Sequence, residues 1–533
     1  MPRSVKDPEV MHQRRWLTLV VVCIGLLVIV LDNTILNVAL PRLAKDLHAS
    51  TSSLQWIVDI YVLVFAGLLL TAGSLGDRFG RYKALTLGMV IFGTGSLASA
   101  LSGSAGMLIA TRAFMGIGGA FIMPATLSII TNVFTDPVER GKAIGIWAGI
   151  SALGAGIGPV VGGFLLSHFY WGSVFFVNVP IVVVTLIAGR FLIPDSRDPS
   201  APKLDPLGAA LSIGGLAAVL YAIIEAPVHG WTSTQIMTTF GVGAAVLALF
   251  VGWELHTASP MLEMRFFKNP RFTAASLAVT LTFLAMLGSL FIMTQYLQSV
   301  LGYTPLEAGA LLIPQAVVVM IVAPTSAKRV QQFGNKKVVA FGLLFVTLGI
   351  LGYSLYGVNS PYWLVIALTM LIGLGMGNVL APATDSIMGS VPREKAGVGS
   401  AMNDTTRQTG GAIGVAVFGS VLASRFTSGL SSARSLAHLP PAVAAQARTG
   451  ITEAVTAARA PGAASYRDAL ISVAKHSFVS GFHAAAYIGA GIICAAGLLV
   501  IRWLPDREQA TEPAPVTASV PEMAPVFTPA FED

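Results

Sequence analysis

Charged side chains inside long apolar stretches are the residues of this chain most able to do chemistry. Asp32 lies within the apolar run 16–40, and Arg112 lies within the run 107–132. A charge at the centre of a bilayer costs about 2.5–3.5 kcal/mol on insertion scales, so such a residue needs a function or a partner. A carboxyl in apolar surroundings can take up and release a proton near neutral pH. We therefore predict that Asp32 binds a proton or substrate; the alternative is a structural cap within a bent helix.

Arg112 cannot lose its charge, so it needs a carboxylate, backbone carbonyls or water beside it. A conditional pair with Asp32 would couple proton binding to helix position, whereas a permanent ion pair would be structural, and the sequence leaves both possibilities open. Asn37 adds another polar group within one and a half turns of Asp32. These three residues form the first predicted site, for proton coupling or substrate binding.

A second group of ionisable residues lies in the last third of the chain. Asp404 and Arg407 fall three residues apart in the apolar run 398–423, and Asp385 ends the run before it. Side chains three apart share one face of a helix, so Asp404 and Arg407 could simply pair with each other. We predict a coupling or substrate role for all three, with a plain ion pair as the alternative.

Enzyme chemistry has no recognisable set of residues in this sequence. The eight histidines are scattered, and the two cysteines, Cys23 and Cys494, lie in separate apolar runs without a CxxC pair. No phosphate-binding GxxxxGK[ST] motif occurs. We expect no catalytic residue, no metal site and no cofactor.

The elements that position these residues are membrane spans. Of the 533 residues, 54% are hydrophobic and only 11% are charged, against roughly 25% charged in soluble domains. A span needs about 20 apolar residues. Fourteen runs meet this requirement, near 16–40, 54–75, 84–103, 107–132, 141–167, 173–193, 206–226, 235–255, 272–298, 306–327, 337–357, 361–386, 398–423 and 480–503. The fold class is therefore an all-α integral membrane protein.

Basic residues determine the expected orientation. They gather in alternate connections, and the short connections between hold only Arg42 and Lys45. Because positive residues stay on the cytoplasmic side, both termini are expected in the cytoplasm. This distribution explains the net charge of +7 without nucleic acid, and the expected partners are the lipid bilayer, a small molecule and protons, with the protein as a monomer.

The chain contains an internal repeat. Residues 124–129 (Pro-Ala-Thr-Leu-Ser-Ile) return as 382–387 (Pro-Ala-Thr-Asp-Ser-Ile), and a glycine cluster precedes each copy. Parallel repeats around a midplane site are typical of secondary transporters. The expected organisation is an N-terminal cytoplasmic segment 1–15, a six-helix bundle 16–193, two inserted helices 206–255, a second six-helix bundle 272–503 that includes a long outer loop 425–478, and a disordered cytoplasmic tail 504–533.

Two glycine-rich motifs suggest moving parts. The short charged connection between the second and third spans could form ion pairs in one conformation and release them in another, so we predict a latch made of Gly73, Asp77, Arg78, Gly80 and Arg81. In the fifth span, glycines recur four apart around a proline, which allows close helix packing and a bend. We predict a joint, with plain helix packing as the alternative, made of Gly154, Gly158, Pro159, Gly162 and Gly163.

Taken together, these motifs resemble the major facilitator superfamily, and in particular its fourteen-spanner drug:proton antiporter family, the QacA and EmrB type. The resemblance covers about 15–505 and rests on the latch segment, on Arg112 with Gly116 and Gly119, on the glycines of the fifth span and on the run Leu31–Pro41. One departure is Trp171-Gly172-Ser173, where the family commonly has an arginine between aromatic residues.

The resemblance implies a major facilitator fold and proton-driven efflux of drugs or antibiotics, lipophilic and in part cationic, by alternating access. It also implies multidrug efflux with antibiotic resistance as its consequence, and a proton gradient in place of any cofactor. A bacterial inner (cytoplasmic) membrane is the location that the resemblance implies. Because a fold does not determine a substrate, export or import of one specific metabolite on the same scaffold stays open.

Overall fold

The computed structural model describes residues 8–504 apart from 48, 50, 198–204, 259, 261, 434–435, 437–438 and 449. The expected tail after Leu504 and the first seven residues lie outside the described part. Within the described residues, fourteen helices are long and apolar enough to cross a membrane. The prediction of an all-α membrane protein is confirmed. Helices suit this setting because each satisfies its own backbone polar groups where water is absent.

The first six spans are α1 (Pro8–Asp46), α2 (Thr51–Phe79), α3 (Arg81–Ala100), α4 (Ala105–Val133), α5 (Pro137–His168), and α6 (Ser173–Phe176) with α7 (Asn178–Leu192). The inserted pair is α8 (Pro206–His229) and α9 (Thr234–His256). The later spans are α10 (Pro270–Gln295) with η2 (Tyr296–Val300), α11 (Pro305–Phe333), α12 (Asn335–Gly352) with η3 (Tyr353–Leu355), α13 (Tyr362–Gly389), α14 (Ala396–Ser432) and α17 (Arg467–Trp503).

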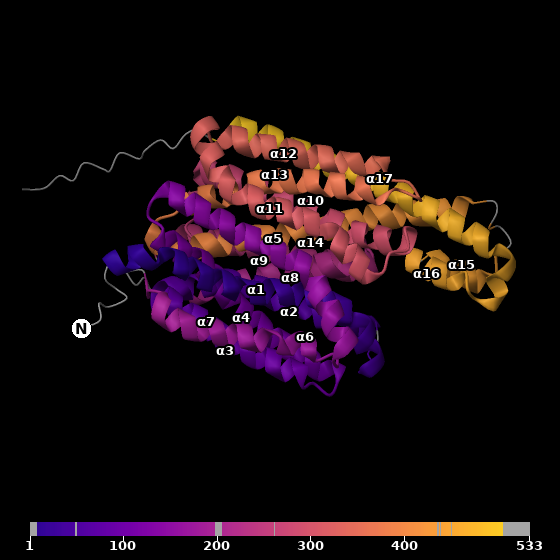
Figure 1. The fold of residues 1–533 in the computed structure, drawn as a ribbon, viewed down its shortest axis with the longest axis horizontal. Helices are drawn as coiled ribbons and strands as arrows, with labels where there is room; N and C mark the ends of the chain where they lie inside the picture. The colour runs from indigo at the N-terminus through magenta and orange to yellow at the C-terminus, as the bar shows by residue number, and fades with distance from the viewer. Residues whose placement is uncertain are drawn as a thin grey trace, which may run out of the picture.

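The helices form two bundles side by side (Figure 1). In the first, α1 packs on α4, α5 and α7, and α4 packs on α2 and α3; in the second, α10 packs on α13, α14 and α17, and α12 packs on α13 and α17. The inserted α8 packs on α9 and also contacts α2 and α14, at the side of both bundles. We call the end where α1 begins and α17 ends the terminal side, and the opposite end the loop side.

The internal repeat is visible in the packing of the two bundles. A Cβ built on Gly88 of α3 would lie 2.8 Å from the carbonyl oxygen of Gly118 on α4. In the second bundle, a Cβ on Gly342 of α12 would lie 2.7 Å from the carbonyl oxygen of Gly375 on α13. Both helix pairs therefore approach at backbone distance through matching glycines, which larger residues would prevent.

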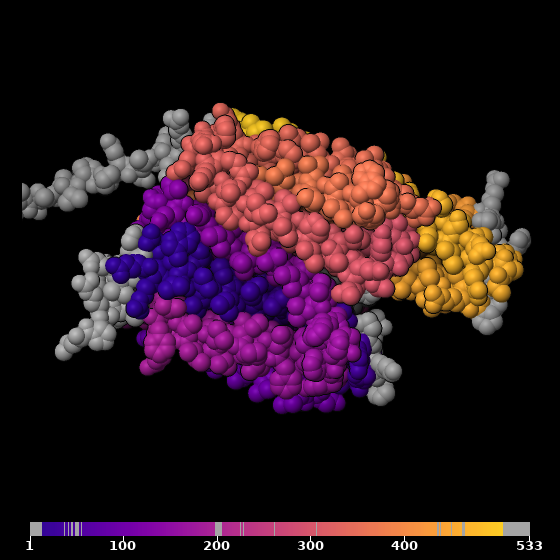
Figure 2. Space-filling view, in the orientation of Figure 1, coloured from indigo at the N-terminus to yellow at the C-terminus, as the bar shows by residue number. Residues whose placement is uncertain are grey.

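The boundary between the bundles is formed mainly by α5 against α11 and by α2 against α14. On α5, a Cβ at Gly145 would lie 2.6 Å from the carbonyl oxygen of Ala323 on α11. Figure 2 shows the first half of the chain, indigo to magenta, meeting the second half, salmon to orange, along this boundary. Backbone-close packing therefore joins α5 to α11 across the boundary.

The loop side carries an extra helical segment. Both α14 and α17 contain 37 residues, so each is about 55 Å long, well beyond a hydrocarbon core of about 30 Å. Between them lie α15 (Pro441–Arg448), α16 (Ile451–Ala457) and η6 (Pro461–Tyr466), which project at one end in Figure 1. The connection outside the two helices is thus shorter than the expected 425–478, because both helices continue past the membrane and bury apolar side chains such as Phe426 and Leu470 there.

Replacing Gly145 with valine should open the boundary on the terminal side, because the added atoms have no room beside α11. Spin labels on exposed Val138 and Gln332, in a protein whose two native cysteines are replaced by alanine, should then show a longer distance by pulsed electron spin resonance. Gly163→Ala is the matched control, since its Cβ would meet Leu306 at an ordinary 3.6 Å. An unchanged distance in Gly145→Val would contradict the packing argument.

Candidate functional site

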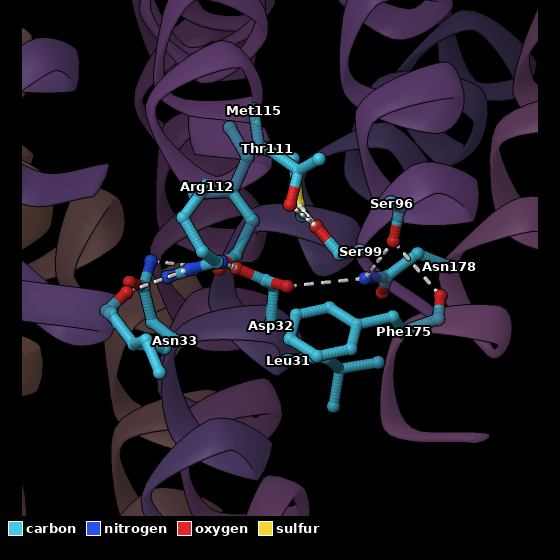
Figure 3. A network of polar contacts seen from close by, with 12 residues as sticks. Leu31, Asp32, Asn33, Ser96, Ser99, Thr111, Arg112, Met115, Phe175 and Asn178 are labelled. Carbon is cyan, nitrogen blue, oxygen red and sulfur yellow. Dashed lines mark hydrogen bonds and ion pairs between the residues drawn. The ribbon is translucent and has the colours of Figure 1, made fainter. Parts of the chain in front are cut away.

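The first predicted site is an ion pair buried inside the first bundle (Figure 3). Asp32 of α1 accepts a hydrogen bond from Nη1 of Arg112 of α4. Asp32 is 2% exposed and Arg112 is fully buried. The structure therefore brings together the two intramembrane charges that the sequence singled out. Each charge compensates the other at a place where water does not solvate them.

Neutral polar groups complete the surroundings of this pair. Asn178, at the start of α7, donates from Nδ2 to Asp32 at 3.3 Å and to the Ser96 hydroxyl of α3 at 3.0 Å. Arg112 donates from Nε to the carbonyl oxygen of Ile57 at 3.1 Å, and its guanidinium lies 4.3 Å from the Tyr61 ring centroid. Side chains or backbone from five helices thus converge on one charge pair, so a change in its protonation would be felt throughout the bundle.

In the part of the chain that the structure describes, the second bundle has no charge pair at the equivalent position. Gly116 of α4 approaches the carbonyl oxygen of Tyr61, and Gly373 of α13 approaches that of Gln315 in the same way. Arg112 lies four residues before Gly116, and Thr369 lies four residues before Gly373, so these two residues occupy corresponding positions. The buried hydroxyl of Thr369 donates to the carbonyl oxygen of Val365 in its own helix. The equivalent helix of the second bundle therefore packs around a hydroxyl rather than a charge pair.

The second predicted group lies on two helices, with Asp404 and Arg407 on α14 and Asp385 near the end of α13, and the structure separates its members. Asp404 is 1% exposed and Arg407 is 6% exposed, yet no ion pair within 4.0 Å joins them, and within the described residues Oδ2 of Asp404 has no hydrogen-bond partner. Arg407 instead donates from Nη2 to the Thr384 hydroxyl of α13 at 3.1 Å. The simple pairing of Asp404 with Arg407, left open by the sequence, does not occur in this conformation.

Two aromatic rings hold the Arg407 guanidinium. Its central carbon lies 4.8 Å from the ring of Trp147 on α5 and 5.1 Å from the ring of Phe283 on α10. Trp147 is fully buried, and its Nε1 donates to the Thr126 hydroxyl of α4 at 3.2 Å. The contact crosses the boundary between the bundles, because α5 belongs to the first and α14 to the second.

The predicted latch segment makes direct polar contacts between the bundles. Asp77 near the end of α2 accepts hydrogen bonds from the backbone N–H groups of Gly397 and Val398 at 2.8 and 3.0 Å. These amides belong to the first turn of α14, where N–H groups lack helical partners and the helix dipole favours negative charge. Asp77 therefore caps a helix of the other bundle.

Arg81 strengthens this contact from the next helix. It donates from Nε to Asp77 at 2.9 Å and from Nη2 to the carbonyl oxygens of Arg393 and Glu394 at 2.6 and 2.9 Å. The last two residues lie in η4 (Arg393–Lys395), just before α14. Asp77 and Arg81 thus bind both backbone N–H groups and backbone carbonyl oxygens around the start of α14.

The other predicted latch residues, Gly73, Gly80 and Arg78, make contacts of different kinds. A Cβ on Gly73 would lie 2.5 Å from the carbonyl oxygen of Gly397, so α2 and α14 need a glycine there. Gly80 has a φ of 119° between α2 and α3, a conformation that favours glycine. Arg78 lies with its guanidinium 5.5 Å from the Phe79 ring.

Asp385 lies on the terminal side, away from the other predicted coupling residues. It accepts a hydrogen bond from Nε of Arg140 of α5 at 2.7 Å, which is a second ion pair across the boundary. It also lines a cavity of about 530 Å³ between α5, α11, α12 and α13. Its geometry is that of a terminal-side contact rather than of a midplane site.

The predicted joint residues of α5 divide between two faces. Gly154, Gly158 and Gly162 face α1 within the first bundle; a Cβ on Gly154 would lie 3.0 Å from Leu27. Pro159 and Gly163 face α11 across the boundary, opposite Gly309 and Leu306. A joint role stays a prediction, but the four-residue spacing reflects packing inside one bundle.

Sequence reasoning missed several residues of these sites. Glycines at 141, 145 and 149 face α11 and precede the noted motif by one or more turns. Asn178, Trp147 and Thr384 could have been noticed as polar or indole groups in apolar runs, but nothing in the sequence pairs them with a distant charge. The side chain of Asn37 lies outside the described residues. Within the described part, no group of three His, Cys, Asp or Glu side chains is placed to hold a metal ion.

Comparisons with known proteins agree with this architecture. The family model described as Major Facilitator Superfamily matches residues 22–415. The multidrug efflux pump LfrA of Mycolicibacterium smegmatis is 38% identical, over 94% of this chain and 97% of that protein. The methyl viologen resistance protein SmvA of Salmonella typhimurium is 34% identical, over 90% of this chain and 96% of that protein. The crystal structure of the human organic anion transporter MFSD10 (TETRAN) shares the fold, with a TM-score of 0.61 at 15% identity, over 92% of this chain and 99% of that one.

Replacing Arg112 with methionine should destabilise the protein by about 3–5 kcal/mol, because Asp32 would be left charged and buried without its partner. The double variant Asp32→Leu, Arg112→Met should recover most of this loss, since the second bundle packs without the pair. Thermal unfolding of the purified variants in detergent measures both. If the double variant is as unstable as the single one, the pair is needed for packing.

Replacing Asp77 with asparagine should favour opening on the terminal side by about 1–2 kcal/mol, because the carboxylate charge at the first turn of α14 is lost. The spin-label distance between positions 138 and 332 should shift toward a longer population. Lys83→Gln, which removes a charge from the exposed start of α3 nearby, is the control and should leave the distance distribution unchanged. An equal shift in both variants would refute a specific role for Asp77.

Proposed function

Since the chain belongs to the major facilitator superfamily, and is thus a membrane transporter of small molecules, we propose that it exports drug-like lipophilic molecules, cations among them, in exchange for protons. Support for export comes from the similarity to LfrA and SmvA over at least 90% of the chain. Neither a resident metal nor an organic cofactor has a role in this proposal.

The observation that carries proton coupling is the buried pair of Asp32 and Arg112. A proton that reaches Asp32 neutralises the carboxylate and releases Arg112, whose charge must then find another partner. Because five helices meet at this pair, the release changes their packing. One proton crossing 100 mV supplies roughly 2.3 kcal/mol, which corresponds to about a forty-fold gradient of a neutral substrate.

The boundary contacts indicate which conformation the structure represents. Asp77, Arg81 and Arg140 bind the second bundle on the terminal side. Under the positive-inside rule this side faces the cytoplasm, and both termini lie there. We propose that these contacts close the transporter to the cytoplasm, that the membrane is the inner membrane and that a monomer is the transporting unit. Substrate release on the loop side is followed by breaking of these contacts and reopening toward the cytoplasm.

We expect the native protein in inside-out vesicles to dissipate a preformed pH gradient when a lipophilic cationic dye is added, and Asp32→Asn to abolish this response. The asparagine keeps the size of the side chain but cannot bind and release a proton. Acridine-type pH probes follow the gradient, and ethidium serves as the transported dye.

Asp59→Asn is the matched control, because it removes a carboxylate from α2 nearer the loop side and should leave exchange intact. Equal exchange by Asp32→Asn and the native protein would remove Asp32 from the mechanism. No response from the native protein would favour a transporter of one specific metabolite.

A further inference from the structure

The Arg407 guanidinium occupies a place that resembles a binding site for a cation. Its central carbon lies over the ring of Trp147 and over the ring of Phe283, at 4.8 and 5.1 Å from their centroids. Aromatic faces attract cations through their negative π surface, and aromatic cages built in this way bind organic cations. Here the cation is one of the protein's own side chains.

This aromatic cage, Trp147 with Phe283, lies near the middle of the membrane. Trp147 follows the start of α5 by ten residues and Arg407 follows the start of α14 by eleven, which places both about 15 Å from the terminal side. Half of a hydrocarbon core of about 30 Å is the same depth. When two bundles rock around a midplane site, groups at this depth move least. A ligand in the cage could therefore keep its contacts in both conformations.

Arg407 has a second possible partner within reach. Asp404 lies three residues earlier on the same helix, is buried, and has an Oδ2 atom that no described group hydrogen-bonds. Nε of Arg407 likewise has no hydrogen-bond partner among the described residues. Both unsatisfied groups would gain a charge-assisted hydrogen bond if Arg407 left the rings and turned toward Asp404. The guanidinium can thus vacate the cage without becoming an unpaired charge.

We propose that the cage of Trp147 and Phe283 binds the planar, delocalised cation of a transported substrate, and that Arg407 fills the cage as a substitute cation when substrate is absent. The inference rests on the proposed export function and names the chemical class for one of its sites. Substrate entry moves Arg407 to Asp404, and the return of Arg407 to the rings displaces the substrate.

The chemistry of the guanidinium defines the class of substrate. It is planar, delocalised and weakly hydrated, and it stacks on aromatic faces, whereas a compact ammonium holds its water strongly. The cage should therefore prefer flat aromatic cations such as ethidium and methyl viologen to compact ammonium ions. Trp147 contributes from the first bundle and Phe283 from the second, so an occupied cage also connects the two.

The test is equilibrium binding of ethidium to the purified full-length protein in detergent, followed by fluorescence anisotropy with methyl viologen as competitor. Trp147→Leu and Phe283→Leu should each weaken binding about three- to thirtyfold, the range of a desolvated cation–π contact. Trp147→Phe keeps an aromatic face and should restore much of the affinity. Arg407→Gln should tighten binding by a similar factor, because the competing cation is gone.

Trp171→Leu is the matched control, since Trp171 is also buried but lies on the loop side between α5 and α6. Thermal unfolding confirms that each variant is folded; if Arg407→Gln is not, Arg407→Lys replaces it and should give a smaller tightening. Unchanged ethidium binding in Trp147→Leu, or weaker binding in Arg407→Gln or Arg407→Lys, overturns the proposal. Ethidium binding needs no proton gradient. If the protein shows no dye exchange but its ethidium binding still depends on the cage, the export proposal fails and the cage proposal stands.

Discussion

The cost of holding charge where water is absent constrains this whole structure. Hydrocarbon cannot solvate an ion, so each charged side chain within the spans must find its counterpart in the protein. Arg112 finds Asp32 inside the first bundle, and Arg81 finds Asp77 at the boundary. Because the two partners of each ion pair come from different helices, the need to pair buried charges also determines which helices stay in contact.

In the proposed transport mechanism, the same rule permits motion at the boundary between the bundles. On the terminal side, Asp77 and Arg81 satisfy the backbone groups around the first turn of α14. This end lies near water, so those groups can be solvated when the bundles separate, and the cost of breaking the contacts is moderate. Along α5 and α11, by contrast, Gly145 brings the backbones together with no polar group to expose. The polar contacts can open while the glycine contacts slide.

The two halves share their packing but divide the chemistry. Matching glycines join α3 to α4 and α12 to α13. In α4 of the first bundle, an arginine precedes Gly116 by four residues, whereas in α13 of the second bundle Thr369 stands at the corresponding position. The second bundle instead carries its buried charges on α14, against Trp147 of the first. One charge pair is thus internal to a bundle, whereas the other group lies where the bundles meet.

The sequence by itself determined the class of protein and most of its spans, because about twenty apolar residues in a row leave few alternatives to a membrane helix. It also singled out Asp32 and Arg112 as charges among apolar residues, and Asp77 and Arg81 as part of a short charged connection between two spans. Only the tertiary structure decided their partners: Asp77 binds backbone amides 320 residues away, and Arg407 binds Trp147 rather than the nearby Asp404. Local patterns reveal the cost of a charge, but the group that offsets it comes from a distant helix, and its position depends on how all the helices pack.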